Sequence, residues 1–164
     1  MQKPALSKPV AIVSGYRTPF TKIGTTLREV SAIELAKAPV NSICDNFSLS
    51  LDPHGMVIFG TVIQHSNISN FAREIVLESK LHPQTQAYTT ILACATSLNA
   101  VIQGALLIAS GRHSWAIAGG SESMSNFPVS FHESFGSVLG DLQFAKTPVE
   151  RLRSLMRLRP KDFL

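Results

Sequence analysis

The chain has 164 residues, 45% of them hydrophobic and 16% charged, which is enough for one packed domain and excludes bulk disorder. Its two cysteines, Cys44 and Cys94, lack CxxC spacing, and no secretory signal is recognisable, which favours reduced thiols in an intracellular protein over a disulfide framework. No apolar stretch reaches the roughly 18 residues that a transmembrane helix requires, and much of the net charge of +4 comes from the last 20 residues.

Strand-like and helix-like segments begin near the N-terminus. The β-branched run PVAIVSG at 9–15 predicts a strand, and apolar residues at helical spacing predict a helix from Ser31 to Phe47. Pro39 lies inside that helix. Because an interior proline costs about 3 kcal/mol, we expect a kink or two helical pieces.

The alternation continues to residue 120. We expect strands over 55–63, 86–92 and 114–120, and helices over 70–80 and 95–109. The resulting order, β-α-β-α-β-α-β with short connections, predicts an α/β fold in which helices cover both faces of a mostly parallel sheet.

The helix over 95–109 has almost no polar face, and we expect it to be buried on nearly all sides. A domain of this size can hardly surround a helix so completely. The pattern therefore predicts that another layer or another chain covers it.

Cys94 follows the predicted strand over 86–92 and precedes this apolar helix. Its sulfur should then lie at the carboxyl edge of the sheet, where ligand sites of open α/β sheets gather, beside helix N–H groups that favour a thiolate and can bind an oxyanion. The alternative is that Cys94 is a small buried hydrophobe, which is how we interpret Cys44.

Basic residues are concentrated in the C-terminal segment, where PVERLRSLMRL predicts a short amphipathic helix. A solvated helix face is one interpretation, and docking to a phosphate-bearing ligand or an anionic surface is the other. Nucleic acid is disfavoured because no aromatic interleaving or recognition motif accompanies the charges. The basic residues are Lys146, Arg151, Arg153, Arg157, Arg159 and Lys161.

Two other sets of polar residues are weaker indications of a functional site. Ser121, Glu122 and Ser123 follow two glycines at a strand exit, where they either border a ligand or merely follow a turn that closes the strand. Arg73 and Glu74 are expected to form structural ion pairs. No GxGxxG, P-loop or metal-ligand cluster occurs in the sequence.

Several motifs together resemble the thiolase family. They are YRTPF at 16–20, AREIVL at 72–77, ACATS around Cys94, the helix ending IASG, and AGGSESMS at 118–125 followed by Pro128. The chain is most similar to the acetyl-CoA C-acyltransferases of fatty-acid β-oxidation, in the branch that includes the β subunit of the trifunctional complex. The resemblance covers nearly the whole chain.

The resemblance implies the N-terminal half of a 3-ketoacyl-CoA thiolase, with a thiolase-like half-fold and a mixed, mostly parallel sheet. Residues 1–128 would be the N-terminal domain, and 129–164 the beginning of a truncated loop domain. Cys94 would attack the ketone carbon and carry the acyl group as a thioester, with coenzyme A as co-substrate and no permanently bound cofactor or metal. The helix after Cys94 would be the central layer of five.

The chain also departs from the family pattern. A thiolase takes its base histidine, a second cysteine and an asparagine from a second half, and His54, His65, His82, His113 and His132 match none of these motifs, so we expect them in loops or at the surface. Position 96, two residues after the cysteine and often Gly in the family, is Thr96. Without the second half, catalysis should fall by orders of magnitude.

Two interpretations of function remain. The first is an acyltransferase portion, completed by a separate C-terminal half or by other thiolase subunits in a homo- or hetero-oligomer. The second is a non-catalytic remnant or interaction module that pairs with an intact thiolase. Acyl-CoA and coenzyme A are the implied ligands. The cytoplasm is the expected compartment, with the mitochondrion as the alternative.

Overall fold

The computed structural model describes residues 8–64, 66–128, 132–159 and 162. The chain forms two compact units, Met1–Pro128 and Val129–Leu164. The first unit contains α1 (Ala32–Phe47), the short 3-10 helix η1 (Leu49–Leu51), β1 (Met56–Gly60), α2 (Phe71–Glu78), β2 (Gln86–Thr90), α3 (Thr96–Ala109) and β3 (Ala116–Gly120). The second contains α4 (Glu133–Phe144) and α5 (Pro148–Leu155).

The three strands form one parallel sheet in the order β2-β1-β3, so β1 is central. Gly60, the last residue of β1, is in register with Thr90 on one side and with Gly120 on the other. All three strands therefore end together, which gives the sheet one carboxyl edge. The predicted α/β fold with a parallel sheet is confirmed, as are the strands expected within 55–63, 86–92 and 114–120.

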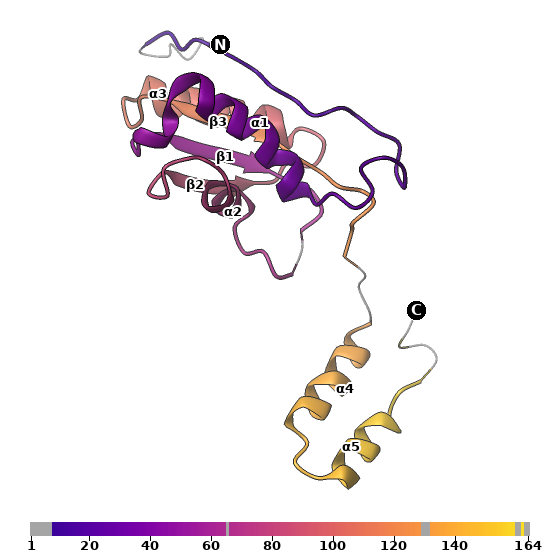
Figure 1. Ribbon diagram of the computed structural model, residues 1–164. Coiled ribbons are helices and arrows are strands. Elements are labelled where there is room, and N and C mark those ends of the chain that lie inside the picture. Colours follow the sequence, from indigo (N-terminus) through magenta and orange to yellow (C-terminus); the bar gives the residue numbers. More distant parts are fainter. Residues whose placement is uncertain (1–7, 65, 129–131, 160–161, 163–164) are drawn as a thin grey trace, which may run out of the picture. The chain divides into compact units, whose positions relative to one another are not determined.

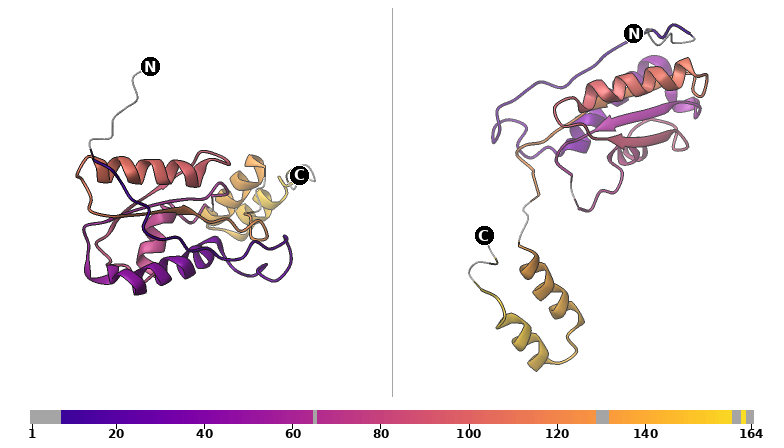
Figure 2. Two further views of the ribbon diagram at one scale, coloured as in Figure 1. Left: turned by 90° about the horizontal axis from the view of Figure 1, so that it is seen from above. Right: turned by 180° about the vertical axis from the view of Figure 1, so that it is seen from behind.

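Helices cover both faces of the sheet, as Figures 1 and 2 show. On one face, α1 and α2 pack over Val57 and Phe59 of β1. On the other face, α3 packs alone over Ile58. Because both of its faces are covered, β1 is buried along its whole length, which is why its sequence is a continuous apolar run without alternation.

The first helix runs without a break through Pro39. Ser31 caps it, accepting from the Glu34 amide at 3.2 Å while the Glu34 carboxylate accepts from the Ser31 amide at 3.0 Å. Buried residues on both sides of the proline, Ala36 and Val40, hold the helix against the sheet. Of the two alternatives expected at Pro39, a kink or two helical pieces, the second is wrong because this packing outweighs the local cost of the proline.

The strand predicted over 9–15 does not form. This segment, indigo in Figure 1, runs as extended coil without a strand partner among the described residues. Ile12 is 86% exposed and Val13 is 75% exposed. The prediction was wrong because β-branched residues only favour an extended backbone, and a strand also needs a neighbouring strand to pair its N–H and C=O groups.

Most of the outward side of α3 is not covered by the described part of this chain, so the layer or second chain expected to cover it lies outside these residues. Thr96, Ala100 and Gly104, which are buried, lie on the side toward the sheet. Its outward side carries exposed Leu98, Val101, Ile102 and Leu106. An apolar side of this extent lies open because the described part of this chain supplies no further layer.

The second unit is a pair of helices. Thr147 caps α5, accepting from the Glu150 amide at 3.2 Å, and Pro148 occupies the first turn, where its missing N–H costs nothing. The amphipathic helix predicted in PVERLRSLMRL is confirmed as α5. Among the described residues, none of the helices is both long enough and apolar enough to cross a membrane.

Replacing Pro39 with Ala should stabilise the chain. The substitution supplies the amide that can bond to the Leu35 carbonyl one turn earlier, and we expect the free energy of unfolding to rise by about 1–3 kcal/mol in urea denaturation. Pro53→Ala, in the loop between Asp52 and His54, is the matched control and should change stability by less than about 0.5 kcal/mol. An equal effect of the two substitutions would contradict a cost specific to the helix.

Candidate functional site

Cys94 lies in the turn that joins β2 to α3, at the carboxyl edge of the sheet. Its side chain is exposed, whereas Cys44 is buried on α1 against the core. Burial in apolar surroundings, assisted by the nearby Asp45 charge, raises the pKa of the Cys44 thiol. Of the two cysteines, Cys94 is therefore the one placed for chemistry.

The backbone of this turn is strained at the residue before Cys94. Ala93 has a φ of 45°, in the left-handed region that residues with a Cβ rarely adopt. The turn closes through hydrogen bonds from the Ala95 amide to the Leu92 carbonyl at 2.9 Å and from the Thr96 amide to the Ala93 carbonyl at 3.2 Å. A left-handed Ala costs about 1 kcal/mol, which these hydrogen bonds offset.

The side chain of Thr96 fastens the same turn from inside. Its hydroxyl accepts from the Leu92 amide at 2.8 Å and donates to the Ala93 carbonyl at 2.7 Å. The residue is buried, at 5% exposure. Thr96 thus bonds to the backbone of the two residues that precede Cys94 and fixes the position of the cysteine.

Glycines at the strand ends allow α3 to begin directly on the sheet. A Cβ on Gly60 would lie 1.9 Å from Cγ2 of Thr96, and one on Gly120 would lie 2.4 Å from the Ser97 hydroxyl. Real Cβ atoms do not come so close. The first turn of α3 can therefore lie over the ends of β1 and β3 only because both positions lack a side chain.

A third contact fixes the start of α3 to β2. The Asn99 amide group donates to the Thr90 hydroxyl at 2.7 Å. No side chain caps the N-terminus of this helix, so the positive end of its dipole lies open beside Cys94. Such a position can stabilise an oxyanion that forms next to it.

Glu122 joins two loops at this edge. One of its oxygens accepts from the Thr61 hydroxyl at 2.8 Å, and the other accepts from the amides of Val62 at 2.7 Å and Ile63 at 3.3 Å. The loop after β1 is thereby bound to the segment after β3. Glu122, two residues after the double glycine, therefore has a structural role at this edge.

The rest of that segment binds the chain before α1. The Ser123 hydroxyl donates to the Val30 carbonyl at 2.8 Å, and the Asn126 side chain donates to the carbonyls of Arg28 at 2.9 Å and Val30 at 3.0 Å. Segments about 95 residues apart in the sequence are thus brought together beside the sheet edge.

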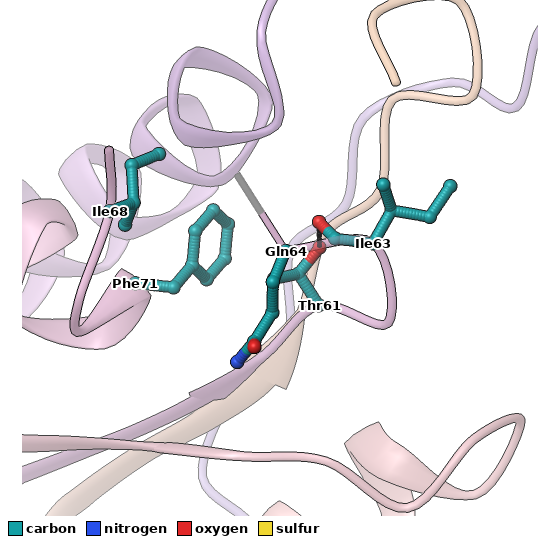
Figure 3. A pocket seen from close by; sticks show the side chains of 5 residues that line it. All are labelled: Thr61, Ile63, Gln64, Ile68 and Phe71. Carbon is teal, nitrogen blue, oxygen red and sulfur yellow. Dashed lines mark hydrogen bonds between the residues drawn. The ribbon is translucent and has the colours of Figure 1, made fainter. Parts of the chain in front are cut away.

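A small pocket opens beside the loop that Glu122 holds. Thr61, Ile63, Gln64, Ile68 and Phe71 line it, and the Thr61 hydroxyl, which donates mainly to Glu122, lies 3.3 Å from the Ile63 carbonyl (Figure 3). A second hollow lies at the opposite, amino edge of the sheet, where Tyr88 donates to Gln103 at 2.6 Å. Cys94 lines neither of them.

The described histidines lie in loops or at a helix end. His54, His82 and His113 are in loops, and His132 caps α4, whereas His65 lies outside the described residues. Within residues 8–64, 66–128, 132–159 and 162, no three His, Cys, Asp or Glu side chains gather closely enough to bind a metal ion.

Sequence reasoning identified Cys94 but missed the residues that support it. Gly60 acts through its contact with Thr96, which is distant in the sequence, whereas the Thr96 hydroxyl bonds to the backbone of the nearby Leu92 and Ala93. The only signals were a strand ending in Gly and a Thr in a first turn. The expectation for Arg73 was wrong. Its guanidinium donates to the carbonyls of Thr85 at 2.9 Å and Pro83 at 2.7 Å instead of pairing with an acid.

Comparisons with known proteins agree with one another. The family model "Thiolase, N-terminal domain" matches residues 10–153. The chain is 37% identical to a 3-ketoacyl-CoA thiolase of Photorhabdus laumondii and 36% identical to one of Escherichia coli, over 155 residues in each case. These alignments cover 94% of this chain and 36% of each relative, so the chain spans about a third of their length.

Solved structures give the same result. The Acat5 thiolase from Ascaris suum, crystallised in complex with coenzyme A, matches with a TM-score of 0.62 and 31% identity over 71% of this chain and 30% of that one. An acetyl-CoA acetyltransferase from Bacillus anthracis matches with a TM-score of 0.60 and 28% identity over 67% of this chain and 27% of that one.

The role of the Thr96 hydroxyl can be tested with two variants, one that removes the hydroxyl and one that removes the methyl group. Thr96→Val keeps the shape but removes the hydrogen bond to the Leu92 amide and one of the two hydrogen bonds to the Ala93 carbonyl. The free energy of unfolding should therefore fall by about 1–3 kcal/mol. The alkylation rate of Cys94 by iodoacetamide should also change severalfold. Thr96→Ser keeps the hydroxyl and should retain the wild-type alkylation rate; identical behaviour of the two variants would show that the hydroxyl does not hold the turn.

Proposed function

This chain belongs to the thiolase family, and we propose that it is the N-terminal portion of an acetyl-CoA C-acyltransferase, a 3-ketoacyl-CoA thiolase of fatty-acid β-oxidation. The observation that carries the proposal is the exposed Cys94 on a strained turn before the uncapped end of α3. Coenzyme A is the proposed co-substrate, in agreement with the relative that was crystallised with it.

The proposed reaction has two steps at the Cys94 sulfur. The thiolate attacks the ketone carbon of a 3-ketoacyl-CoA, and the bond between the α and β carbons breaks. The acyl group stays on Cys94 as a thioester, while the acetyl-CoA carbanion leaves and takes up a proton. The thiolate of a second coenzyme A then attacks the thioester and releases an acyl-CoA shortened by two carbons together with the free cysteine.

The residues described here account for only part of this chemistry. They supply a nucleophile, a helix dipole and backbone amides, which suit the negative charge that develops on the attacked oxygen. The described histidines are placed in loops or at a helix cap and do not point to a base beside Cys94. We therefore place the base and the rest of the site on the other two thirds of a thiolase, or on a partner that carries them.

The exposed side of α3 supports such a partner. Leu98, Ile102 and Leu106 lie at helical spacing on the side away from the sheet, and Leu98 is 64% exposed. A complementary thiolase half, or another thiolase subunit in a homo- or hetero-oligomer, would cover this side. In that arrangement α3 would become an interior layer.

The two units fit separate parts of a thiolase. We assign residues 1–128 to the N-terminal domain and residues 129–164 to the beginning of a loop domain. We place the protein in the cytoplasm. The two 3-ketoacyl-CoA thiolases compared are bacterial, and they lend no support to the mitochondrial alternative.

A second candidate function is an interaction module without activity of its own. It is favoured by the exposed apolar side of α3 together with the absence of a base beside Cys94 in the described part of the chain. In that case the chain would pair with an intact thiolase through α3, and Cys94 would have no catalytic role.

Alkylation measures whether the cysteine site forms in this chain. Intact-mass analysis with iodoacetamide near neutral pH should show fast addition of one label, which disappears in Cys94→Ser and persists in Cys44→Ser, because Cys44 is buried and its pKa is raised. Slow labelling, or equal labelling of both cysteines, would favour the interaction module.

Complementation tests the reaction itself. The chain alone should cleave acetoacetyl-CoA poorly, and coexpression with the C-terminal two thirds of the Escherichia coli relative should raise thiolysis by at least about 100-fold, the contribution expected from a positioned base. Cys94→Ser should abolish the gain. A gain that survives this substitution would show that Cys94 is not the nucleophile.

A further inference from the structure

The hollow at the amino edge of the sheet lies at the far end of α3 from Cys94, and the proposed reaction makes no use of it. Side chains of β1, β2, α3 and the chain that follows α3 line it. Its volume is about 270 Å³, roughly nine times the share of one water molecule in the liquid. A hollow of this size has room for one small molecule.

The inner wall of the hollow is apolar and aromatic. Met56 belongs to the core cluster beneath α3, and Tyr88 and Leu107 pack against that cluster. Leu106 continues the wall outward and is 52% exposed. Because the Tyr88 hydroxyl donates to the Gln103 side chain at 2.6 Å, its ring is held in place and can stack on a flat apolar group.

A tight turn at the end of α3 brings a guanidinium to the hollow. The Gly111 amide donates to the Ile108 carbonyl at 2.9 Å, and the Arg112 amide donates to the Leu107 carbonyl at 3.1 Å. These are the two hydrogen bonds of a Schellman motif, and Gly111 has the left-handed φ of 75° that the motif requires. The backbone of Arg112 is thereby fixed against the last turn of the helix.

Positive charge and N–H donors gather here without a carboxylate. Arg112 forms no ion pair within residues 8–64, 66–128, 132–159 and 162, and no Asp or Glu of this part of the chain lines the hollow. His113 is held by its Nδ1, which lies 3.2 Å from the His54 carbonyl oxygen and must donate, because a carbonyl only accepts. The amide nitrogen of Gln103 has no partner among the described residues, since Tyr88 occupies only its oxygen.

We propose that this hollow binds a small aromatic carboxylate, with the carboxylate on the Arg112 guanidinium and the ring against Tyr88 and Leu107. The planar fork of a guanidinium matches the two oxygens of a carboxylate. One arginine suits a single negative charge better than the double charge of a phosphate. A rigid ring also loses less conformational entropy on binding than an alkyl chain of the same size.

Calorimetric titration of the 164-residue chain with benzoate tests the proposal. Benzoate should bind saturably with a Kd of about 1 mM or lower. Benzyl alcohol, which lacks the charge, and acetate, which lacks the ring, should each bind at least about 10-fold more weakly. Inorganic phosphate should not compete with benzoate.

Variants of the lining residues locate the binding. Arg112→Gln should weaken benzoate binding by at least about 10-fold, because it removes a charge-assisted hydrogen bond. Gln86→Trp, at an exposed position at the start of β2, puts an indole into the hollow and should abolish binding. Arg151→Gln is the matched control, since Arg151 is also exposed and forms no ion pair among the described residues, and it should leave binding unchanged.

Circular dichroism of each variant should match the wild type, because the substituted side chains are exposed. Undiminished binding by Arg112→Gln or Gln86→Trp, displacement of benzoate by phosphate, or no saturable binding by the wild type would overturn the proposal. In the last case, the carboxylate of a protein partner would be the remaining ligand for Arg112. Cys94→Ser should not alter benzoate binding, so this proposal and the proposed function can fail separately.

Discussion

The close approach of α3 to the ends of the central strands is the constraint on which the candidate site depends. Gly60 and Gly120 lie directly beneath Thr96 and Ser97, with no room for a Cβ at either position. Because β1 and β3 are parallel and in register, both glycines lie at the same edge of the sheet. The start of α3 is held there, and with it the turn that carries Cys94.

The free-energy cost of the strained backbone in that turn is small compared with the contribution of the hydrogen bonds that hold it. Ala93 adopts a left-handed backbone conformation, and the two hydrogen bonds of the Thr96 hydroxyl bracket it. A buried hydroxyl with both partners satisfied is costly to disturb, whereas a left-handed Ala costs about 1 kcal/mol. The conformational preference of the Ala93 backbone is therefore overridden by these side-chain hydrogen bonds, a pattern found at many functional sites.

The same edge is assembled from segments that are far apart in the sequence. Glu122 binds the loop after β1, and Asn126 binds the chain before α1. Hydrogen bonds hold this edge together, whereas mainly apolar contacts hold the interior of the sheet. A polar edge on an apolar sheet is where a charged intermediate can be stabilised without exposing the core, which fits the acyl transfer proposed for this chain.

The sequence by itself determined the helices and strands around the sheet, because a continuous apolar run such as 56–60 and the periodicity of α1, α2 and α3 are local properties. It also located Cys94, through its place between a strand and a helix. Only the tertiary structure decided that residues 9–15 do not pair, that α1 runs through Pro39, and that one side of α3 is exposed. Strand pairing needs a neighbour, a proline is tolerated where packing outweighs its cost, and burial depends on what else the chain supplies. The supporting roles of Gly60 and Glu122 likewise arise from contacts between distant segments, which composition and spacing do not record. The role of Thr96 depends on the left-handed backbone conformation of the nearby Ala93.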